Sequence, residues 1–366
     1  MTVYTVLTLL TTGIHPSTSR IVGVDAVQFD DAGTQVAELF SPVNPGEDIG
    51  PVHAHSFRAE DMGRAPRFAS VSKKLEPLVD GSTLIVHNGP RTWGFLCTET
   101  HRAVEAARRQ RRRKKPGVRR LKPETIVDTL ASLRRQGVYL SDTRVAGCAR
   151  TLGLDVSPVA SVARSELSAA ERARRDTQLV WWLYQRELGG IDPARPAAGA
   201  ALVPAPSWVP VPKTPASVAV HGGRPVLAGP GVLSVRRPEE LARDRFGLQR
   251  TVARVQAASA RRPYVNPGVL EDRLVQGMEV VIAPEIQADP NDLLEAMAGT
   301  GLAYSEKLSR ATSVVVCNED ESDPSRPLQG KAMHGARKGI PRVSDVEFLR
   351  LVRDVAPGVA APPTTL

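Results

Sequence analysis

The sequence VYTVLTLLTTG at residues 3–13 combines a run of apolar and β-branched residues with a Thr-Thr-Gly ending. Residues 20–29 (RIVGVDAVQF) alternate in part between apolar and polar side chains, which is typical of a half-buried strand. The tetrapeptide DDAG at 30–33 is a turn signal, and residues 34–43 form the next extended segment. We therefore expect the chain to begin with a three-stranded meander.

Helices are predicted after this meander. Apolar residues recur at helical spacing in four segments, which are residues 65–79, 124–135, 143–152 and 168–187. Residues 82–86 form a short apolar strand between the first two of them. Strands followed by helices, with one inserted strand, predict an α/β domain over residues 1–190, in which helices flank a mixed sheet.

Composition excludes several classes of protein. The chain has 366 residues, a net charge of +9 and 42% hydrophobic residues, enough for two domains with their own cores. Cys97, Cys148 and Cys317 form no C-x-x-C pair, so no zinc knuckle or disulfide framework is predicted. No apolar run approaches the roughly 18 residues of a membrane span, and the apolar N-terminus lacks the basic residues of a secretory signal. We expect a cytoplasmic protein without membrane contact.

Positive charge is concentrated at residues 108–122 (RRQRRRKKPGVRRLK), where ten of fifteen side chains are basic and none is acidic. Without this basic segment the net charge would be 9 − 10, or about −1. One interpretation is an inserted arm that binds phosphates; the other is a solvated loop in an arginine-rich protein. The candidate nucleic-acid ligands in the basic segment are Arg108, Arg109, Arg111, Arg112, Arg113, Lys114, Lys115, Arg119, Arg120 and Lys122.

The rest of the chain is divided by composition. Residues 191–217 are rich in proline and alanine, which predicts an extended linker. Residues 218–273 are interpreted as a partly helical connecting segment, with a helix at 238–260, and residues 356–366 as a tail. Residues 274–355 show a second α/β pattern. Its predicted strands are 278–283, 302–304 and 313–317, and its predicted helices are 290–298, 330–338 and 343–353.

Short motifs follow one another along residues 3–188. They are TLLTTG at 8–13, RIV at 20–22, VNPG at 43–46, HN at 87–88, GFL at 94–96 and VDT at 127–129. In order and spacing this segment resembles the DEDDh family of proofreading exonucleases. The resemblance implies a ribonuclease-H-like fold and an ancestral 3′-to-5′ exonuclease reaction, in which paired divalent metals activate water.

The same resemblance implies that the metal ligands are missing. The family holds Mg²⁺ or Mn²⁺ with four acids and uses a histidine as general base. Thr8, Leu10 and Thr92 stand at three of the acid positions and Glu171 at the histidine position, so only Asp176 is retained. We therefore expect a degenerate exonuclease domain that binds no metal cofactor.

Other residues keep an alternative open. Asp25, Asp128 and Glu171 are candidates for substitute ligands, in which case Mg²⁺ or Mn²⁺ would still be bound, although surface or capping roles are the ordinary explanation. The resemblance also implies nucleic-acid contacts at the strand end and beside it. These candidates are Thr11, Thr12, Gly13, His87 and Asn88. The alternative is that Thr-Thr-Gly turns the chain and His-Asn caps a helix.

Residues 274–355 carry GMEVVI at 277–282, GTG at 299–301, VVV at 314–316, GK at 330–331 and GIPRVS at 339–344. This pattern resembles a BRCT domain, which implies phosphopeptide, DNA-end or protein binding. Lys331 stands at the position of a phosphate-binding lysine, but Ala283 stands where a hydroxyl is expected, and Thr300 is a substitute donor. A solvated Lys331 is the alternative.

Three functions remain compatible with these patterns. The first is a DNA-binding or scaffold factor in DNA repair or replication, associated with the nucleoid, that binds a single strand or a 3′ end through a pseudo-exonuclease domain. The second is an active exonuclease with substituted ligands. The third is a protein-interaction scaffold without nucleic-acid contact.

Overall fold

The computed structural model describes residues 3–109, 118–154, 167–191, 219–221, 224–226, 231–319 and 322–362, the two short segments by their backbone alone. The predicted linker therefore lies almost entirely outside the described residues. The chain forms two compact units. The N-terminal unit contains Met1–Leu133, Leu140–Ala219 and Pro230–Arg250, and the C-terminal unit contains Arg134–Tyr139, Val220–Gly229 and Thr251–Leu366.

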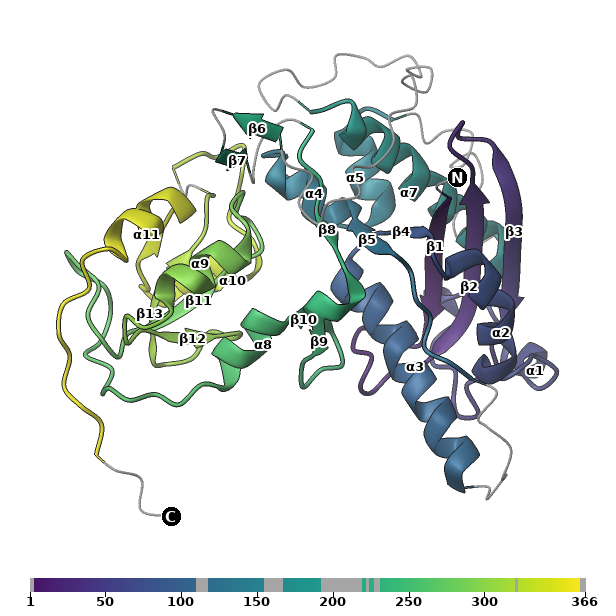
Figure 1. Ribbon diagram of the computed structural model, residues 1–366, viewed down its shortest axis with the longest axis horizontal. Coiled ribbons are helices and arrows are strands. Elements are labelled where there is room, and N and C mark those ends of the chain that lie inside the picture. Colours follow the sequence, from purple (N-terminus) through teal and green to yellow (C-terminus); the bar gives the residue numbers. More distant parts are fainter. Residues whose placement is uncertain are drawn as a thin grey trace. The chain divides into compact units, whose positions relative to one another are not determined.

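A six-stranded mixed sheet forms the centre of the N-terminal unit (Figure 1). Its strands are β1 (Tyr4–Thr11), β2 (Ile21–Phe29), β3 (Gln35–Pro42), β4 (Thr83–Val86), β5 (Thr125–Asp128) and β8 (Val235–Arg236), in the order β3-β2-β1-β4-β5-β8. The β1-β2-β3 pairs are antiparallel, β1-β4 and β4-β5 are parallel, and β8 is antiparallel to β5. The predicted meander and the mixed sheet are confirmed.

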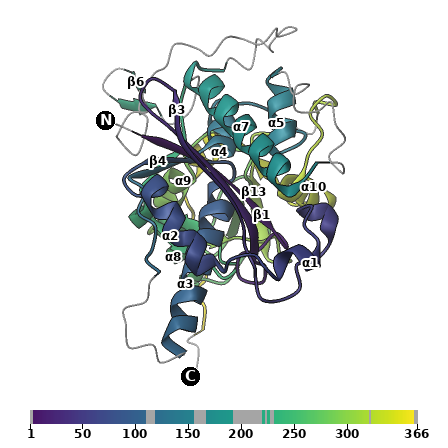
Figure 2. The same ribbon diagram turned by 90° about the vertical axis from the view of Figure 1, so that its right-hand side faces the viewer.

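Helices cover both faces of this sheet. They are α1 (Ala59–Met62), α2 (Phe68–Val79), α3 (Gly89–Arg109), α4 (Thr129–Arg135), α5 (Val145–Thr151) and α7 (Ala169–Leu188). Successive strand side chains point to opposite faces, so Leu7 packs in the core with α2 and α3, whereas Val6 packs with α7. Figure 2 shows α2 and α7 on opposite sides of β1. Thr8, two residues beyond Val6, therefore faces α7.

The predicted helix at 124–135 is wrong over its first half. Residues 125–128 form β5, which pairs in parallel with β4 at every position from Thr83↔Thr125 to Val86↔Asp128. The β-branched sequence Thr-Ile-Val suits a strand, and the helix α4 begins only at Thr129. The partner strand, not local periodicity, decided this assignment.

The predicted helix at 238–260 is wrong over its first half as well. A 3₁₀ turn (Pro238–Glu240) precedes a hairpin of β9 (Leu241–Arg243) and β10 (Gln249–Thr251), and only α8 (Val252–Ser259) is helical. Asp244 Oδ1 accepts the backbone N–H groups of Phe246 and Leu248 at 2.8 and 2.9 Å, and Gly247 adopts φ +80°. This side-chain turn reverses the chain where the periodicity predicts continuation.

The C-terminal unit contains a four-stranded parallel sheet of order β12-β11-β13-β14. Its elements are β11 (Glu279–Ile282), α9 (Pro290–Met297), β12 (Ala303–Ser305), β13 (Thr312–Val316), α10 (Gly330–Arg337), β14 (Arg342–Val343) and α11 (Asp345–Leu351). Val280 and Val314 pack with residues of α9 and α11, whereas Val315 packs against α10 on the other face. The predicted α/β pattern of this region is confirmed.

Two further strands, β6 (Ala219–His221) and β7 (Arg224–Val226), pair only with each other. No helix among the described residues has both the length and the apolar character that crossing a bilayer requires.

Candidate functional site

Thr8 and Leu10 are both used to pack β1 against α7. The Thr8 hydroxyl lies 2.7 Å from the Thr177 hydroxyl and 3.2 Å from the carbonyl oxygen of Ala173. Leu10 is only 6% exposed and belongs to an apolar cluster that includes Phe57 and Ala173. Neither side chain offers a free oxygen atom to a metal, because the Thr8 hydroxyl is hydrogen-bonded to α7 and the Leu10 side chain is a hydrocarbon.

Two of the other residues at the family's positions, Thr92 and Glu171, have hydrogen-bond partners of their own. Glu171 caps α7: its carboxylate accepts the Ser168 N–H at 2.9 Å and the Ser168 hydroxyl at 2.6 Å, and these bonds lower its pKa. Thr92 is buried and donates to the His87 carbonyl at 3.0 Å. Asp176 lies on α7, one residue before Thr177. The structure thus brings Thr8 and Leu10 together with α7, but it engages Thr92 and Glu171 elsewhere.

The substitute acids are engaged in other contacts. Asp25 is fully buried opposite Thr8 in the β1–β2 register, and its Oδ1 lies 2.9 Å from Arg174 Nη2. Asp128 Oδ1 accepts the backbone N–H of Asn88 at 3.0 Å and that of Leu130 at 3.1 Å. Across the part of the N-terminal unit that the structure describes, no three His, Cys, Asp or Glu side chains bring ligand atoms together as a metal site requires.

The side chain of Arg91, a residue of α3, contacts the end of β1. The sequence motifs do not identify this residue. Its Nη2 donates to Thr11 Oγ1 at 2.7 Å and to the Gly13 carbonyl at 3.3 Å, and its guanidinium lies 5.5 Å from the centre of the Phe95 ring. Burial lowers the pKa of Arg91. Its Nε is buried without a hydrogen-bond partner, and no carboxylate of the described residues forms an ion pair with it. The one feature of the sequence that could have pointed to Arg91 is its place directly before Thr92, the candidate position for a metal-binding acid.

The Thr-Thr-Gly segment forms the turn between β1 and β2. The Thr12 N–H donates to the Arg20 carbonyl at 3.0 Å, and the Thr12 hydroxyl accepts the Arg20 N–H at 3.0 Å. A Cβ on Gly13 would lie 2.5 Å from Ser19 Oγ, so a larger residue there would require the Ser19 side chain to move. The Ser17 N–H donates to the Phe246 carbonyl at 3.0 Å, which attaches the loop to the β9–β10 hairpin.

His87 and Asn88 connect β4 to neighbouring elements. The two ring nitrogens of His87 lie 2.8 Å from Thr129 Oγ1 and 2.9 Å from the Thr143 carbonyl. Asn88 adopts φ +61°, and its carbonyl accepts the N–H groups of Arg91 and Thr92 in the first turn of α3. These contacts match the capping alternative; nucleic-acid contacts by His87 and Asn88 stay a prediction.

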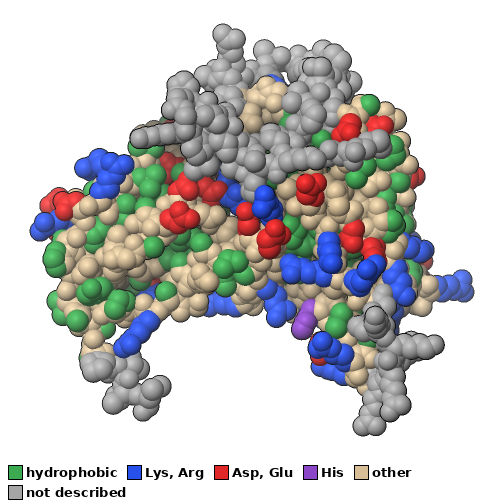
Figure 3. Space-filling view, in the orientation of Figure 1, with side chains coloured by type: hydrophobic (Ala, Val, Ile, Leu, Met, Phe, Trp, Pro, Cys, Tyr) green, Lys and Arg blue, Asp and Glu red, His purple; other side chains and the backbone are tan. Residues whose placement is uncertain are grey.

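The described part of the basic segment is exposed. Val118 and Leu121 point inward, at 6% and 3% exposed, while the cations between and around them face solvent. These exposed cations are Arg108, Arg109, Arg119, Arg120 and Lys122; Arg111, Arg112, Arg113, Lys114 and Lys115 lie outside the described residues. Figure 3 shows Lys and Arg side chains gathered over α3 and the strands beside it.

Thr300 and Lys331 lie at opposite edges of the C-terminal sheet. The Thr300 hydroxyl donates to the Met297 carbonyl at 2.7 Å, and the adjacent Gly301 carbonyl accepts the Gly277 N–H, before β11 begins. Lys331 Nζ donates to the Ile282 carbonyl at 2.9 Å, at the end of β11. The structure therefore does not bring the two candidate phosphate ligands together.

No protein-family model matches the chain, and no curated protein matches it in sequence. Among solved structures, it is similar to E. coli exonuclease I in complex with a dT13 oligonucleotide, with a TM-score of 0.37 and 13% identity over 50% of this chain and 40% of that one. It is also similar to cell-death related nuclease 4, with a TM-score of 0.35 and 9% identity over 50% of this chain and 63% of that one. The chain thus covers less than two thirds of either structure.

Proposed function

We propose that this chain binds nucleic acid through an exonuclease-like unit that no longer cleaves its ligand, and that it serves in DNA repair or replication. The observation that carries the proposal is that Thr8 and Leu10, at the first two metal-ligand positions of the resemblance, are committed to the β1–α7 interface. Two adjacent dications need several carboxylates to offset their charge. The contacts of Asp25, Asp128 and Glu171 argue against the alternative of an active nuclease with substituted ligands.

The positive charge of Arg91 at the end of β1 supports the proposal that the protein binds nucleic acid. Arg91 is a largely buried cation without an acidic partner among the described residues, and leaving a charge in this state costs free energy. A phosphate group would supply both the missing negative charge and acceptors for the guanidinium. The neighbouring Thr11 hydroxyl, which Arg91 already contacts, adds a polar group at the same point.

The length of α3 sets the distance between Arg91 and the start of the basic segment. Arg91 lies in the first turn of α3 and Arg109 is its last residue, so at about 1.5 Å per residue they lie roughly 27 Å apart along the helix. A stacked strand rises about 3.4 Å per nucleotide, so about eight nucleotides span that distance. A single strand of this length can contact Arg91 and the basic segment together.

Binding of labelled oligodeoxythymidines to the full chain tests the proposal. Affinity should rise steeply between about 4 and 12 nucleotides and then change little, because longer strands add no new contact of either kind. The slope of log affinity against log salt should be negative, by about 0.7 for each phosphate neutralised. Binding that is independent of length and salt would instead support the third alternative, a scaffold without nucleic-acid contact.

Nuclease activity is tested separately. A 3′-labelled single strand incubated with the protein in Mg²⁺, and then in Mn²⁺, should remain intact. The same assay with Asp176→Ala identifies the source of any cleavage. Shortening that disappears in this variant would show that the old site still works, and it would replace our proposal with the active-exonuclease alternative.

The C-terminal unit is proposed to be a BRCT-like module for protein contact, on the basis of its motifs and its parallel sheet. Its sheet edge beside Lys331 also contains the carboxyl groups of Glu285 and Glu319, which would repel a phosphate. We therefore propose a partner surface that does not depend on phosphorylation.

A further inference from the structure

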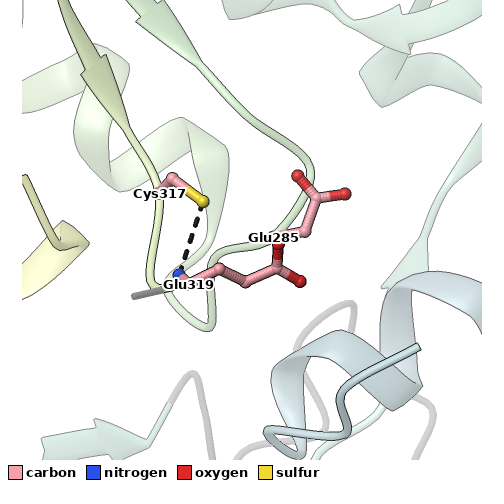
Figure 4. Close-up of side chains that lie close together, drawn as sticks. All are labelled: Glu285, Cys317 and Glu319. Carbon is pink, nitrogen blue, oxygen red and sulfur yellow. Dashed lines mark hydrogen bonds between the residues drawn. The ribbon is translucent and has the colours of Figure 1, made fainter. Parts of the chain in front are cut away.

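Glu285, Cys317 and Glu319 form a compact cluster at the C-terminal edge of the parallel sheet (Figure 4). One ligand atom from each, two carboxylate oxygens and the Cys317 Sγ, lies within 4.8 Å of the others. Cys317 directly follows β13, and Glu285 lies three residues beyond the end of β11. The two strands are parallel neighbours, so their ends meet at one edge.

Backbone bonds hold the ligand-bearing loops in position. The Ala283 N–H donates to the Val316 carbonyl at 2.9 Å, and the Asn318 N–H donates to the Glu285 carbonyl at 2.8 Å, so the pairing continues past the strands. The Asn318 side chain donates to the buried carboxylate of Asp345 at 2.9 Å, which fixes the loop between Cys317 and Glu319 to the start of α11. The cluster is therefore built on rigid elements.

Two carboxylate oxygens in the cluster are buried without a partner. Glu285 Oε2 and Glu319 Oε2 are both inaccessible to solvent and accept no hydrogen bond, whereas Glu285 Oε1 lies 3.6 Å from Arg134. The Cys317 thiol is 3% exposed and receives only a weak 3.4 Å bond from the Glu319 N–H. Arg134 is a cationic neighbour of Glu285, yet one carboxylate oxygen of each glutamate still has no hydrogen-bond donor.

We propose that Glu285, Cys317 and Glu319 bind one divalent transition-metal ion of the zinc type, with water in the fourth position. One thiolate and two carboxylates are ligands that zinc accepts, whereas Mg²⁺ and Ca²⁺ avoid sulfur. In a tetrahedral zinc site the ligand atoms lie roughly 3.4 to 3.6 Å apart, so small side-chain rotations close the cluster around the ion. The inference is independent of nucleic-acid binding by the N-terminal unit.

Binding displaces one proton from sulfur. A cysteine thiol without a metal is mostly protonated near neutral pH, because its ordinary pKa is about 8.5. The metal–sulfur bond forms as the S–H bond breaks, the proton leaves to solvent, and no electron is transferred. Affinity should therefore increase as pH rises.

Cobalt titration of the chelator-treated full chain tests the site, because a cobalt–thiolate bond absorbs in the near ultraviolet. We expect one equivalent of Co²⁺ to produce this absorption and one equivalent of Zn²⁺ to remove it. Cys317→Ser should abolish the band. Glu285→Gln and Glu319→Gln should each weaken binding by at least about tenfold. Cys97→Ser is the matched control, because Cys97 lies in the other unit and outside the cluster.

Thermal unfolding provides a second measurement. Zn²⁺ should raise the melting temperature of the wild type and of Cys97→Ser, but not that of a folded Cys317→Ser variant, because only ligands of the native state stabilise it. Equal responses of the wild type and Cys317→Ser to both metals would overturn the proposal.

Discussion

Arg91 Nη2 donates a 2.7 Å hydrogen bond to Thr11 Oγ1, so a cation from the first turn of α3 contacts the end of the central strand β1. Here the described residues provide a single positive side chain without an acidic partner. An anion such as a phosphate would supply both a charge partner and hydrogen-bond acceptors for this guanidinium.

Replacement of Arg91 by methionine should weaken binding of single-stranded DNA by about tenfold or more, because a charge-assisted hydrogen bond to phosphate is lost. The free energy of unfolding should change little, because the partly buried cation has no acidic partner but does donate hydrogen bonds to Thr11 and Gly13. Fluorescence anisotropy and urea unfolding measure the two quantities. Arg150→Met, which removes an exposed arginine on α5, is the matched control for net charge. Equal affinities of the two variants would contradict a role for Arg91.

Leu10→Glu should destabilise the protein strongly, because position 10 is buried in an apolar cluster. The glutamate carboxylate would enter the apolar cluster of Phe57 and Met62 without a partner, at a cost of several kcal/mol. Leu10→Met conserves volume and should cost less than about 1.5 kcal/mol. Urea denaturation compares the two variants. If Leu10→Glu were as stable as Leu10→Met, the position would be open to solvent and available to a metal.

Asp25→Asn should lower the free energy of unfolding by roughly 2 to 3 kcal/mol, somewhat below the usual range for buried ion pairs. The loss is moderated because Arg174 is one-third exposed and keeps Glu38 as a partner. Arg174→Met should cost more, because it leaves the fully buried Asp25 carboxylate unpaired. The double variant should be less destabilised than the sum of the two changes, and additive losses would show that the pair is not coupled.

His55 should make the protein less stable as the pH falls below about 6.5. Burial lowers its pKa from the ordinary 6.5, and the Phe57 N–H donates to its Nδ1 at 3.1 Å, which requires an unprotonated nitrogen there. Above pH 6.5 the ring is neutral in both states. Below it, the unfolded chain binds the proton first, so the free energy of unfolding decreases.

Unfolding free energies measured from about pH 7.5 to 5 should show this decrease in the wild type and in the control His101→Gln, an exposed position on α3. His55→Asn should have a flatter profile over the same range. Parallel profiles for the wild type and His55→Asn would assign the pH dependence to other groups.

The strands of the opening meander were predictable because residue alternation and a turn signal are local, and the sheet uses them as expected. The strand β5 and the β9–β10 hairpin were not. The sequence 124–135 has apolar residues at helical spacing, and only pairing with β4 shows that its first half is extended. The hairpin depends on the Asp244 side chain, which bonds to the backbone of the turn.

The absence of carboxylates at positions 8, 10 and 92 is evident from the residues alone, because threonine and leucine have no carboxylate in any fold. The use of Arg91 and the convergence of Glu285, Cys317 and Glu319 were not visible. Cys317 lies 32 residues from Glu285 and forms no recognisable metal motif. The sequence determines which chemical groups the protein has. Distances between these groups and their burial decide which partners a charge has and what free energy its burial costs. Both arise only in the tertiary structure, where strands distant in sequence end at the same edge of a sheet.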